Sequence, residues 1–288
     1  CVVIQDRPEH FDAADVLDSA VRHGATSLLI VGDPMARPLI DELEARPRPL
    51  EKVRHILSGG AVLSPTSKAR LQRLLPEVTI LDVLGSTESG RQGVATTAPG
   101  GDTSASFKPS ATTTVLAADL SRRLDAHDPG VGWLAQGGRV PLGYLGDPEK
   151  TDSTFPEIAG ERFAVAGDRA RWLPDGTVEL LGRDSVCINT GGEKVFAEEV
   201  ETAIKTHPDV YDAVVCGRPS DRWGEEVVAI VAVRDGTRPS DADLIEAAGA
   251  HIAHYKLPKE VLRVGSVLRS PSGKADYRWA RAQATASG

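Results

Sequence analysis

Residues 78–90 read VTILDVLGSTESG, an apolar run that ends in a loop of small and hydroxyl-bearing residues. An apolar run of this length, followed at once by glycine, is typical of a buried strand. Similar runs occupy 26–31 and 53–57, and an amphipathic stretch at 13–21 comes before them. Strands that alternate with helices predict an α/β fold with a parallel sheet, in which ligands bind beyond the carboxyl ends of the strands.

The composition is that of a globular protein with a packed core. The chain has 288 residues, which suits one large domain or two ordinary ones. Hydrophobic residues make up 41% and charged residues 26%, so disorder is not expected. The formal net charge of −8 argues against nucleic acid as the main partner, because phosphate backbones require basic surfaces.

The cysteines and the apolar runs bear on the compartment. Cys1, Cys187 and Cys216 show no CxxC spacing, which favours free thiols in a reducing cytoplasm. No apolar run is long enough for a transmembrane segment. The chain starts without Met in the strand-like run at 2–4, and we interpret it as the later part of a larger fold.

The pattern changes after residue 90. From about 91 to 182, Gly, Pro and Thr increase and short β-like pieces replace the helices. This predicts a small antiparallel sheet or barrel. We therefore predict one large domain over 1–183, with a βα sheet in 1–105 and a β-barrel-like part in 106–183.

The last hundred residues are predicted to form a small α+β domain over 184–288. Residues 197–206 have a helical pattern, whereas 210–215 and 227–233 read as strands. Ser240, followed by acidic residues, predicts the start of a second helix.

The loop Gly85-Ser86-Thr87-Glu88 is a candidate phosphate site. Backbone N–H groups and hydroxyls after a strand can bind phosphate, and a carboxylate there can hold Mg²⁺, which prefers oxygen ligands. The simpler interpretation is an ordinary turn with a solvated glutamate.

Three further motifs have a functional and a simpler interpretation. Asp168, after Gly167, can accept hydrogen bonds from ribose hydroxyls, or it can belong to a tight turn. In the run 182–195, Arg183 can reach a phosphate or ribose and the paired Gly191 and Gly192 allow close approach of a ligand, but the run also fits a β-hairpin. Lys274, on a glycine-containing loop, is either a mobile charge for phosphate or a surface lysine.

In their order and spacing these motifs resemble the adenylate-forming superfamily, which includes acyl-CoA synthetases, luciferases and peptide-synthetase adenylation domains. Ser58-Gly59-Gly60-Ala61 is similar to the adenine-side loop of that family, and 85–88 to its Gly-Ser/Pro-Thr-Glu signature. Residues 133–144 resemble its segment that ends in Gly-Tyr. The runs 188–196 and 274–280 resemble those of actinobacterial fatty-acid and steroid-side-chain CoA ligases.

The resemblance implies a role for each motif in an ATP-dependent acyl-CoA synthetase that uses ATP, Mg²⁺ and CoA. Lys274, Glu88 and Thr87 would be catalytic, with Glu88 the magnesium ligand. Gly59, Gly60 and Ala61 would form the adenine-side loop, and Gly85 and Ser86 the phosphate turn. Asp168 and Arg183 would bind the ribose. Ser185 would be the hinge, and Gly191 and Gly192 would line the CoA channel.

The Ser/Thr/Gly-rich phosphate loop of that family, with its lysine, has no counterpart in this sequence. We therefore expect the chain to be the later part of a longer enzyme and to be inactive alone. The acid substrate is expected to be hydrophobic, and a homo-oligomer is compatible with the sequence. Two alternatives stay open: a non-catalytic nucleotide-binding fragment, and an adenylation domain that feeds a carrier protein.

Overall fold

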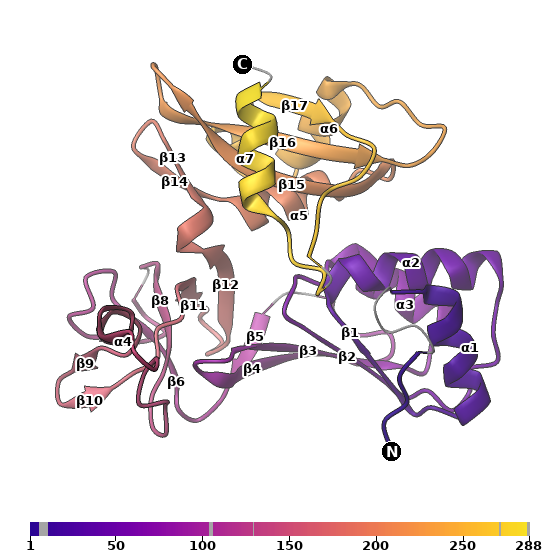
Figure 1. The fold of residues 1–288 in the computed structure, drawn as a ribbon, viewed down its shortest axis with the longest axis horizontal. Helices are drawn as coiled ribbons and strands as arrows, with labels where there is room; N and C mark the ends of the chain where they lie inside the picture. The colour runs from indigo at the N-terminus through magenta and orange to yellow at the C-terminus, as the bar shows by residue number, and fades with distance from the viewer. Residues whose placement is uncertain (6–10, 104–105, 129, 271, 287–288) are drawn as a thin grey trace. The chain divides into compact units, whose positions relative to one another are not determined.

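The computed structural model describes residues 1–5, 11–103, 106–128, 130–270 and 272–286. Its internal contacts define two compact units. The first unit comprises Cys1–Ala166, Ala170–Leu180 and Pro271–Lys274, and the second comprises Gly167–Arg169, Leu181–Ser270 and Ala275–Gly288. Figure 1 follows the chain through both units by colour.

The first unit begins with the parallel strands that the apolar runs predicted. Strands β1 (Ser27–Ile30), β2 (His55–Gly59) and β3 (Thr79–Ser86) pair side by side. Gly59 is in register with Val83, so the loops that follow β2 and β3 leave the sheet at the same edge. This edge carries two of the predicted ligand loops.

Three helices cover one face of these strands (Figure 1): α1 (Ala13–His23), α2 (Gly32–Ala45) and α3 (Pro65–Leu74). Their apolar residues pack against every second residue of the strands, as Leu17, Ile40 and Ile56 illustrate. Polar caps define the helix ends: Asp12 accepts a hydrogen bond from the N–H of Asp15 at the start of α1. The other face of β1 is open, since Leu29 is 81% exposed.

The Gly- and Pro-rich region forms antiparallel strands, as predicted, and these continue the same sheet. The strand order is β1-β2-β3-β4-β5-β12-β11-β8-β6-β7. The added strands are β4 (Gly90–Thr97), β5 (Ser106–Pro109), β6 (Thr113–Leu116), β7 (Arg123–Leu124), β8 (Gly132–Gln136), β11 (Asp168–Trp172) and β12 (Val178–Arg183).

A short helix, α4 (Pro148–Thr154), interrupts the strands of this region, followed by the hairpin of β9 (Glu157–Ile158) and β10 (Glu161–Arg162). Helix α4 was not predicted from the sequence, because none of its residues is buried and no apolar periodicity marks it. Its local signals were nevertheless present: Asp147 accepts a hydrogen bond from the N–H of Lys150, and Pro148 occupies the first turn.

The second unit is built on a long antiparallel pair, β15 (Val210–Ser220) and β16 (Gly224–Val233). Helices α5 (Ala197–Ile204) and α6 (Asp241–Gly249) pack on one face of this pair, and α7 (Tyr277–Ala286) packs on the other. The remaining elements are β13 (Cys187–Thr190), β14 (Glu193–Phe196), β17 (Glu260–Arg263) and the short 3₁₀ turns Asp184–Val186 and His254–Lys256.

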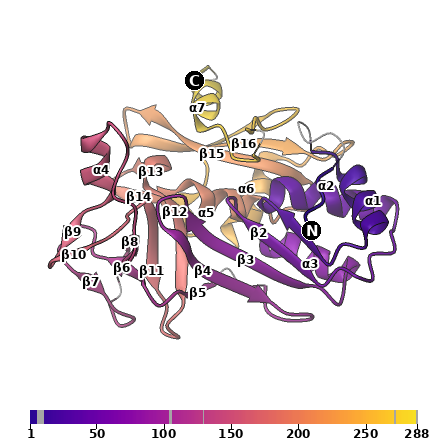
Figure 2. The same cartoon turned by 60° about the horizontal axis from the view of Figure 1, so that its bottom comes forward.

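The predicted start of α6 is confirmed. The hydroxyl of Ser240 accepts a hydrogen bond from the N–H of Asp243, whose carboxylate in turn accepts from the N–H of Ser240. Figure 2 shows the elements of this unit from a second direction. Within the described part of the chain, no helix combines the length and apolar character needed to cross a membrane.

Candidate functional site

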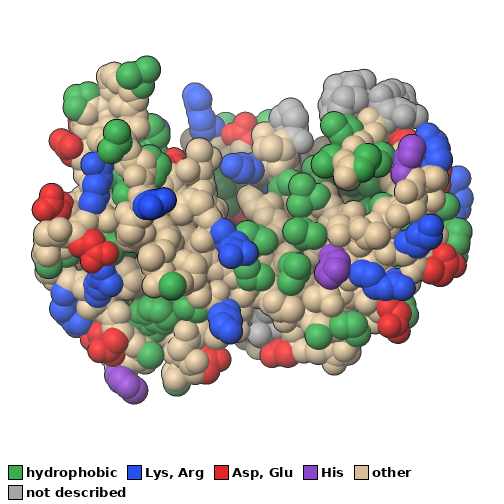
Figure 3. Space-filling model, turned by 90° about the horizontal axis from the view of Figure 1, so that it is seen from below, with side chains coloured by type: hydrophobic (Ala, Val, Ile, Leu, Met, Phe, Trp, Pro, Cys, Tyr) green, Lys and Arg blue, Asp and Glu red, His purple; other side chains and the backbone are tan. Residues whose placement is uncertain are grey.

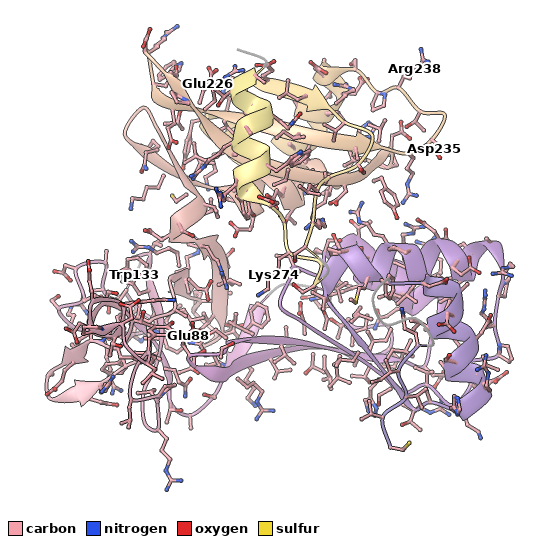
Figure 4. The ribbon with its side chains drawn as sticks, in the orientation of Figure 1. Glu88, Trp133, Glu226, Asp235, Arg238 and Lys274 are labelled. Atoms are coloured by element: carbon pink, nitrogen blue, oxygen red, sulfur yellow. The ribbon has the colours of Figure 1, made fainter. Side chains whose placement is uncertain are left out.

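Residues 85–90 form the tight turn between β3 and β4, with Glu88 near its tip (Figure 4). Ser86 and Ser89 close the turn: the N–H of each donates to the hydroxyl of the other, at 3.1 and 3.2 Å. A Cβ atom at Gly85 would clash with the carbonyl oxygen of Gly90, so only glycine fits there. The turn is thus held by its own backbone and hydroxyls, which leaves Thr87 exposed.

The carboxylate of Glu88 is positioned by a tyrosine from a distant segment. The hydroxyl of Tyr144 donates to Oε1 of Glu88 at 2.6 Å. Tyr144 is itself fixed, because its N–H donates to the Thr151 hydroxyl at 2.8 Å and the Lys150 ammonium lies 4.1 Å from its ring centre. The hydrogen bond from Tyr144 lowers the pKa of Glu88, against the smaller opposing effect of burial. Glu88 is therefore ionised at neutral pH.

An ionised, partly exposed Glu88 fits one kind of magnesium site. Within the described residues, no group of three or more His, Cys, Asp or Glu side chains is placed to hold a metal ion. Mg²⁺ often binds through one or two carboxylates, with waters and substrate phosphates as its other ligands. Glu88 suits that arrangement and not a cage made wholly of protein groups.

The loop Ser58-Gly59-Gly60-Ala61 lies beside this turn, after the neighbouring strand β2. Gly60 has a φ of 84°, a left-handed conformation that favours glycine. The hydroxyl of Ser58 accepts a hydrogen bond from the N–H of Gly32 at 3.2 Å. On the other side of the loop, Asp33 accepts two hydrogen bonds from Ser64, at 2.9 and 3.0 Å. The loop is therefore anchored at both ends.

A buried ion pair joins helix α3 to strand β3. The ammonium of Lys68 is 3.1 Å from the carboxylate of Asp82, in the middle of strand β3. Burial raises the pKa of Asp82, and Lys68 counteracts this effect. The ion pair was not predicted, although a charged residue within the apolar run at 78–84 was a sequence signal for it.

The predicted ribose residues form an ion pair in the second unit. Arg183, at the end of β12, lies 3.4 Å from Asp168, at the start of β11. Their chain neighbours pair in the same way, with Arg169 donating to Asp184 at 2.8 Å. Asp168 is largely buried, whereas the Arg183 side chain is half exposed.

The predicted hinge residue Ser185 is exposed and lies in the 3₁₀ turn between β12 and β13. The contact boundary at Leu180–Leu181 falls close to it in sequence. The separate mobile domain over 184–288 remains a prediction.

Gly191 and Gly192 form the exposed turn of the β13–β14 hairpin, with φ values of 60° and 87°. The indole of Trp223 backs this turn: the N–H of Gly191 donates to the carbonyl of Trp223 at 2.8 Å. A Cβ atom at Gly191 would lie only 3.1 Å from the indole ring. The glycine pair was predicted as either a hairpin or a ligand-facing surface, and this geometry allows both.

Lys274 lies on the loop before α7, in the short segment that groups by its contacts with the first unit (Figure 4). Pro271, in the same predicted motif, lies outside the described residues. The face shown in Figure 3 has basic, acidic and apolar side chains interspersed.

The fold is that of the adenylate-forming enzymes. The structure matches ATP-bound MatB from Rhodopseudomonas palustris with a TM-score of 0.79 and 26% identity, over 95% of this chain and 53% of that one. Residues 199–274 match the family described as the AMP-binding enzyme C-terminal domain. The α/β fold class and the resemblance predicted from the motifs are thereby confirmed.

Within this class, the chain is homologous to actinobacterial acyl-CoA ligases. It is 50% identical to the medium-chain acyl-CoA ligase Mig of Mycobacterium avium, over 98% of this chain and 52% of that protein. It is 44% identical to the 3-oxocholest-4-en-26-oate–CoA ligase of Rhodococcus rhodochrous, over 91% of this chain and 48% of that protein. The chain thus spans about half the length of the curated relatives it matches.

Proposed function

We propose that this chain is part of an ATP-dependent acyl-CoA synthetase. Such an enzyme converts a carboxylic acid, ATP and CoA to acyl-CoA, AMP and pyrophosphate through an acyl-adenylate. The observation that carries the proposal is the 50% identity to a medium-chain acyl-CoA ligase over 98% of this chain. The ionised Glu88, beside the Gly59-Gly60-Ala61 loop at one sheet edge, supports it.

In the first step, the substrate carboxylate attacks the α-phosphorus of ATP and pyrophosphate leaves. No general base is needed, because a carboxylate is already ionised at neutral pH. Catalysis therefore depends on positioning the reactants and on stabilising the negative charge that develops on the phosphate oxygens. Gly85, Ser86 and Thr87 would contact phosphate oxygens, and Lys274 would neutralise the charge that develops on them. Bound through Glu88, Mg²⁺ would supply further charge neutralisation.

The nucleoside would be held by the adenine-side loop and the Asp168–Arg183 pair. Asp168 is largely buried, and its two side-chain oxygens suit the paired hydroxyls of a ribose. Binding there would compete with Arg183, which is 3.4 Å away and exposed enough to turn toward a phosphate.

In the second step, the CoA thiolate attacks the acyl-adenylate and AMP leaves. We propose that the small domain rotates about Ser185 between the steps, so that Lys274 withdraws and the Gly191-Gly192 turn lines the channel for CoA. The indole of Trp223, directly behind Gly191, would form one wall of that channel.

We propose a hydrophobic acid as the substrate, because the two ligases compared above are named for a medium-chain acyl group and a steroid side chain. A reducing cytoplasm is the compartment we propose for the enzyme. For the 288-residue chain alone we expect no acyl-adenylate, since the sequence holds no counterpart of the family's phosphate loop.

The two half-reactions of the full-length protein test this function. Lys274→Ala should slow acyl-adenylate formation by about 100-fold or more, the cost of one oxyanion-stabilising group, and spare thioester formation from supplied acyl-adenylate. Ser185→Pro should do the reverse, because proline restricts the φ change that a hinge requires. Lys259→Ala, at another exposed lysine, and Ser185→Ala are the matched controls.

If Lys274→Ala slows both steps equally, or if Ser185→Pro leaves transfer to CoA unchanged, the proposed rotation of the small domain is wrong. A single fixed active site would then explain both steps better. Thioester formation with free CoA separates this enzyme from an adenylation domain that serves a carrier protein.

A further inference from the structure

The carboxyl group of Glu198, in the first turn of α5, faces the backbone that leads into the predicted hinge. The N–H of Arg183 donates to Oε1 of Glu198 at 3.3 Å, across 15 residues of sequence. The other oxygen, Oε2, is fully enclosed and has no hydrogen-bond partner among the described residues. The candidate site described above does not use this side chain.

Gly182 and Glu198 occupy complementary space. Gly182 is buried, with a φ of 140°, and a Cβ atom there would clash with Oε2 of Glu198. It would also lie 3.4 Å from Cβ of Phe196. The end of β12 therefore rests directly on the Glu198 carboxyl group, and a movement of either one must involve the other.

The surroundings of Glu198 oppose its ionisation. Burial is the main cause, followed by the negative charge of Glu201 on the same helix and, to a smaller extent, that of Asp168 on β11. They raise the pKa of Glu198 to about 7, although hydrogen bonds from the N–H groups of Glu198 and Arg183 oppose them. Burial is the main cause that raises the pKa values of Tyr277 on α7 and Cys187 on β13, and the negative charge of Glu198 adds a smaller effect to both. At neutral pH, therefore, Glu198 exists in both charge states.

We propose that Glu198 is a positioning residue of the hinge: as a neutral acid it holds the Gly182–Arg183 backbone against α5, and as a carboxylate it releases it. Ionisation leaves an enclosed charge beside Glu201 and Asp168, and this cost outweighs the hydrogen bond from the N–H of Arg183, which favours the carboxylate. The cost is relieved when the carboxylate reaches water. This requires β12 to separate from α5. The catalytic consequence of this role for Glu198 rests on the domain rotation about Ser185 proposed above.

The backbone contact can be tested by hydrogen exchange at Gly182–Arg183 in the full-length protein, which requires no substrate. The wild-type protein, compared with Glu198→Gln at each pH, should lose protection there by at least about threefold between about pH 6 and pH 8. The comparison cancels the intrinsic pH dependence of exchange, since the amide of Gln cannot ionise. Glu198→Met, neutral but unable to accept the hydrogen bond, should show low protection at every pH.

Glu199→Gln is the matched control, since Glu199 is the next residue along the helix and pairs with Lys256 at 2.7 Å. It should show the wild-type pH dependence. Equal pH dependence in the wild type and in both neutral variants, Glu198→Gln and Glu198→Met, would overturn the proposal. If Glu198→Gln does not fold, Glu198→Met decides the matter in the same way.

The two half-reactions, measured over the same pH range, test the consequence for catalysis. The ratio of adenylation to thioester formation should change with pH in the wild type by at least about threefold more than in Glu198→Gln. If neither half-reaction occurs with any acid, the proposed function fails while hydrogen exchange still decides the role of Glu198. If the half-reactions occur and exchange is identical in all variants, only the Glu198 proposal fails.

Discussion

Two glutamates, one in each unit, lie near glycines at which a Cβ atom would clash, yet they carry opposite charge preferences. Glu88 in the β3–β4 turn receives a hydrogen bond from Tyr144, which lowers its pKa. Glu198 at the start of α5 has an enclosed oxygen and acidic neighbours, which raise its pKa to about 7.

The difference shows that the residue type does not decide the chemistry of either position. A donor from a rigid segment stabilises the carboxylate of Glu88, which suits a group that must attract a cation. Enclosure without a donor at Oε2 stabilises the neutral acid at Glu198, which suits a group whose charge changes near neutral pH. This difference between Glu88 and Glu198 can be tested by altering the charge of each glutamate, its hydrogen-bond donor or its charged neighbours.

The largest effect is expected from removing the charge of Glu88. In the full-length protein, Glu88→Gln should reduce the rate of adenylation by about 100-fold, as for other groups that stabilise a developing charge. The fold should be unaffected, because Glu88 lies in an exposed turn. Initial rates at varied Mg²⁺ concentration measure this, with Glu149→Gln on the surface of α4 as the control. Normal turnover and normal Mg²⁺ dependence in Glu88→Gln would exclude Glu88 from the site.

An effect of comparable size is expected on stability from Glu198. Its pKa is raised from 4.5 to about 7 on folding, so the unfolded chain releases the proton first as pH rises. The stabilisation is complete below about pH 4.5 and is lost as the pH approaches 7, with a maximum loss of about 3 kcal/mol.

Urea unfolding of the second unit at about pH 5 and about pH 7.5 measures this loss. Glu198→Gln should remove it, and Glu199→Gln should keep it. A Glu198→Gln protein whose stability depends on pH as strongly as the wild type would show that Glu198 has an ordinary pKa.

The sequence predicted the parts of the structure that depend on local patterns. The three parallel strands follow apolar runs, and α6 begins where Ser240 and Asp243 predicted it. The Tyr144–Glu88 contact joins residues 56 positions apart, and no local pattern encodes such a distance. The pKa of Glu198 likewise depends on Gly182 and Asp168, which only the folded chain brings together.

The donor to Glu88 can be removed without altering the carboxylate itself. Tyr144→Phe keeps the ring and its contact with Lys150 but loses the 2.6 Å hydrogen bond. A hydrogen bond to a charged group contributes about 1.5 kcal/mol, so adenylation at limiting Mg²⁺ should fall by about tenfold. Saturating Mg²⁺ should restore much of the rate, because the carboxylate remains. A loss that is independent of Mg²⁺ would assign Tyr144 to another role.

The smallest effect concerns the neighbours of Glu198. Glu201 is the larger electrostatic cause of its raised pKa and Asp168 the smaller, so both Glu201→Gln and Asp168→Asn should lower the pH at which Gly182–Arg183 loses protection. Asp168→Asn also frees Arg183, now 3.4 Å from Asp168, and a released guanidinium would stabilise the Glu198 carboxylate further. Both consequences of Asp168→Asn lower the pH at which Gly182–Arg183 loses protection.

The shift from Asp168→Asn should still be the smaller one, because Arg183 already offsets the charge of Asp168, whereas Glu201 is fully enclosed on the same helix as Glu198. Hydrogen exchange across pH measures both midpoints, with Asp175→Asn, at an exposed turn, as the control. An upward shift in Asp168→Asn would mean that Arg183 acts on Glu198 through the backbone contact alone. The charge of Asp168 would then have no part in releasing the hinge, and enclosure and Glu201 would be the remaining causes.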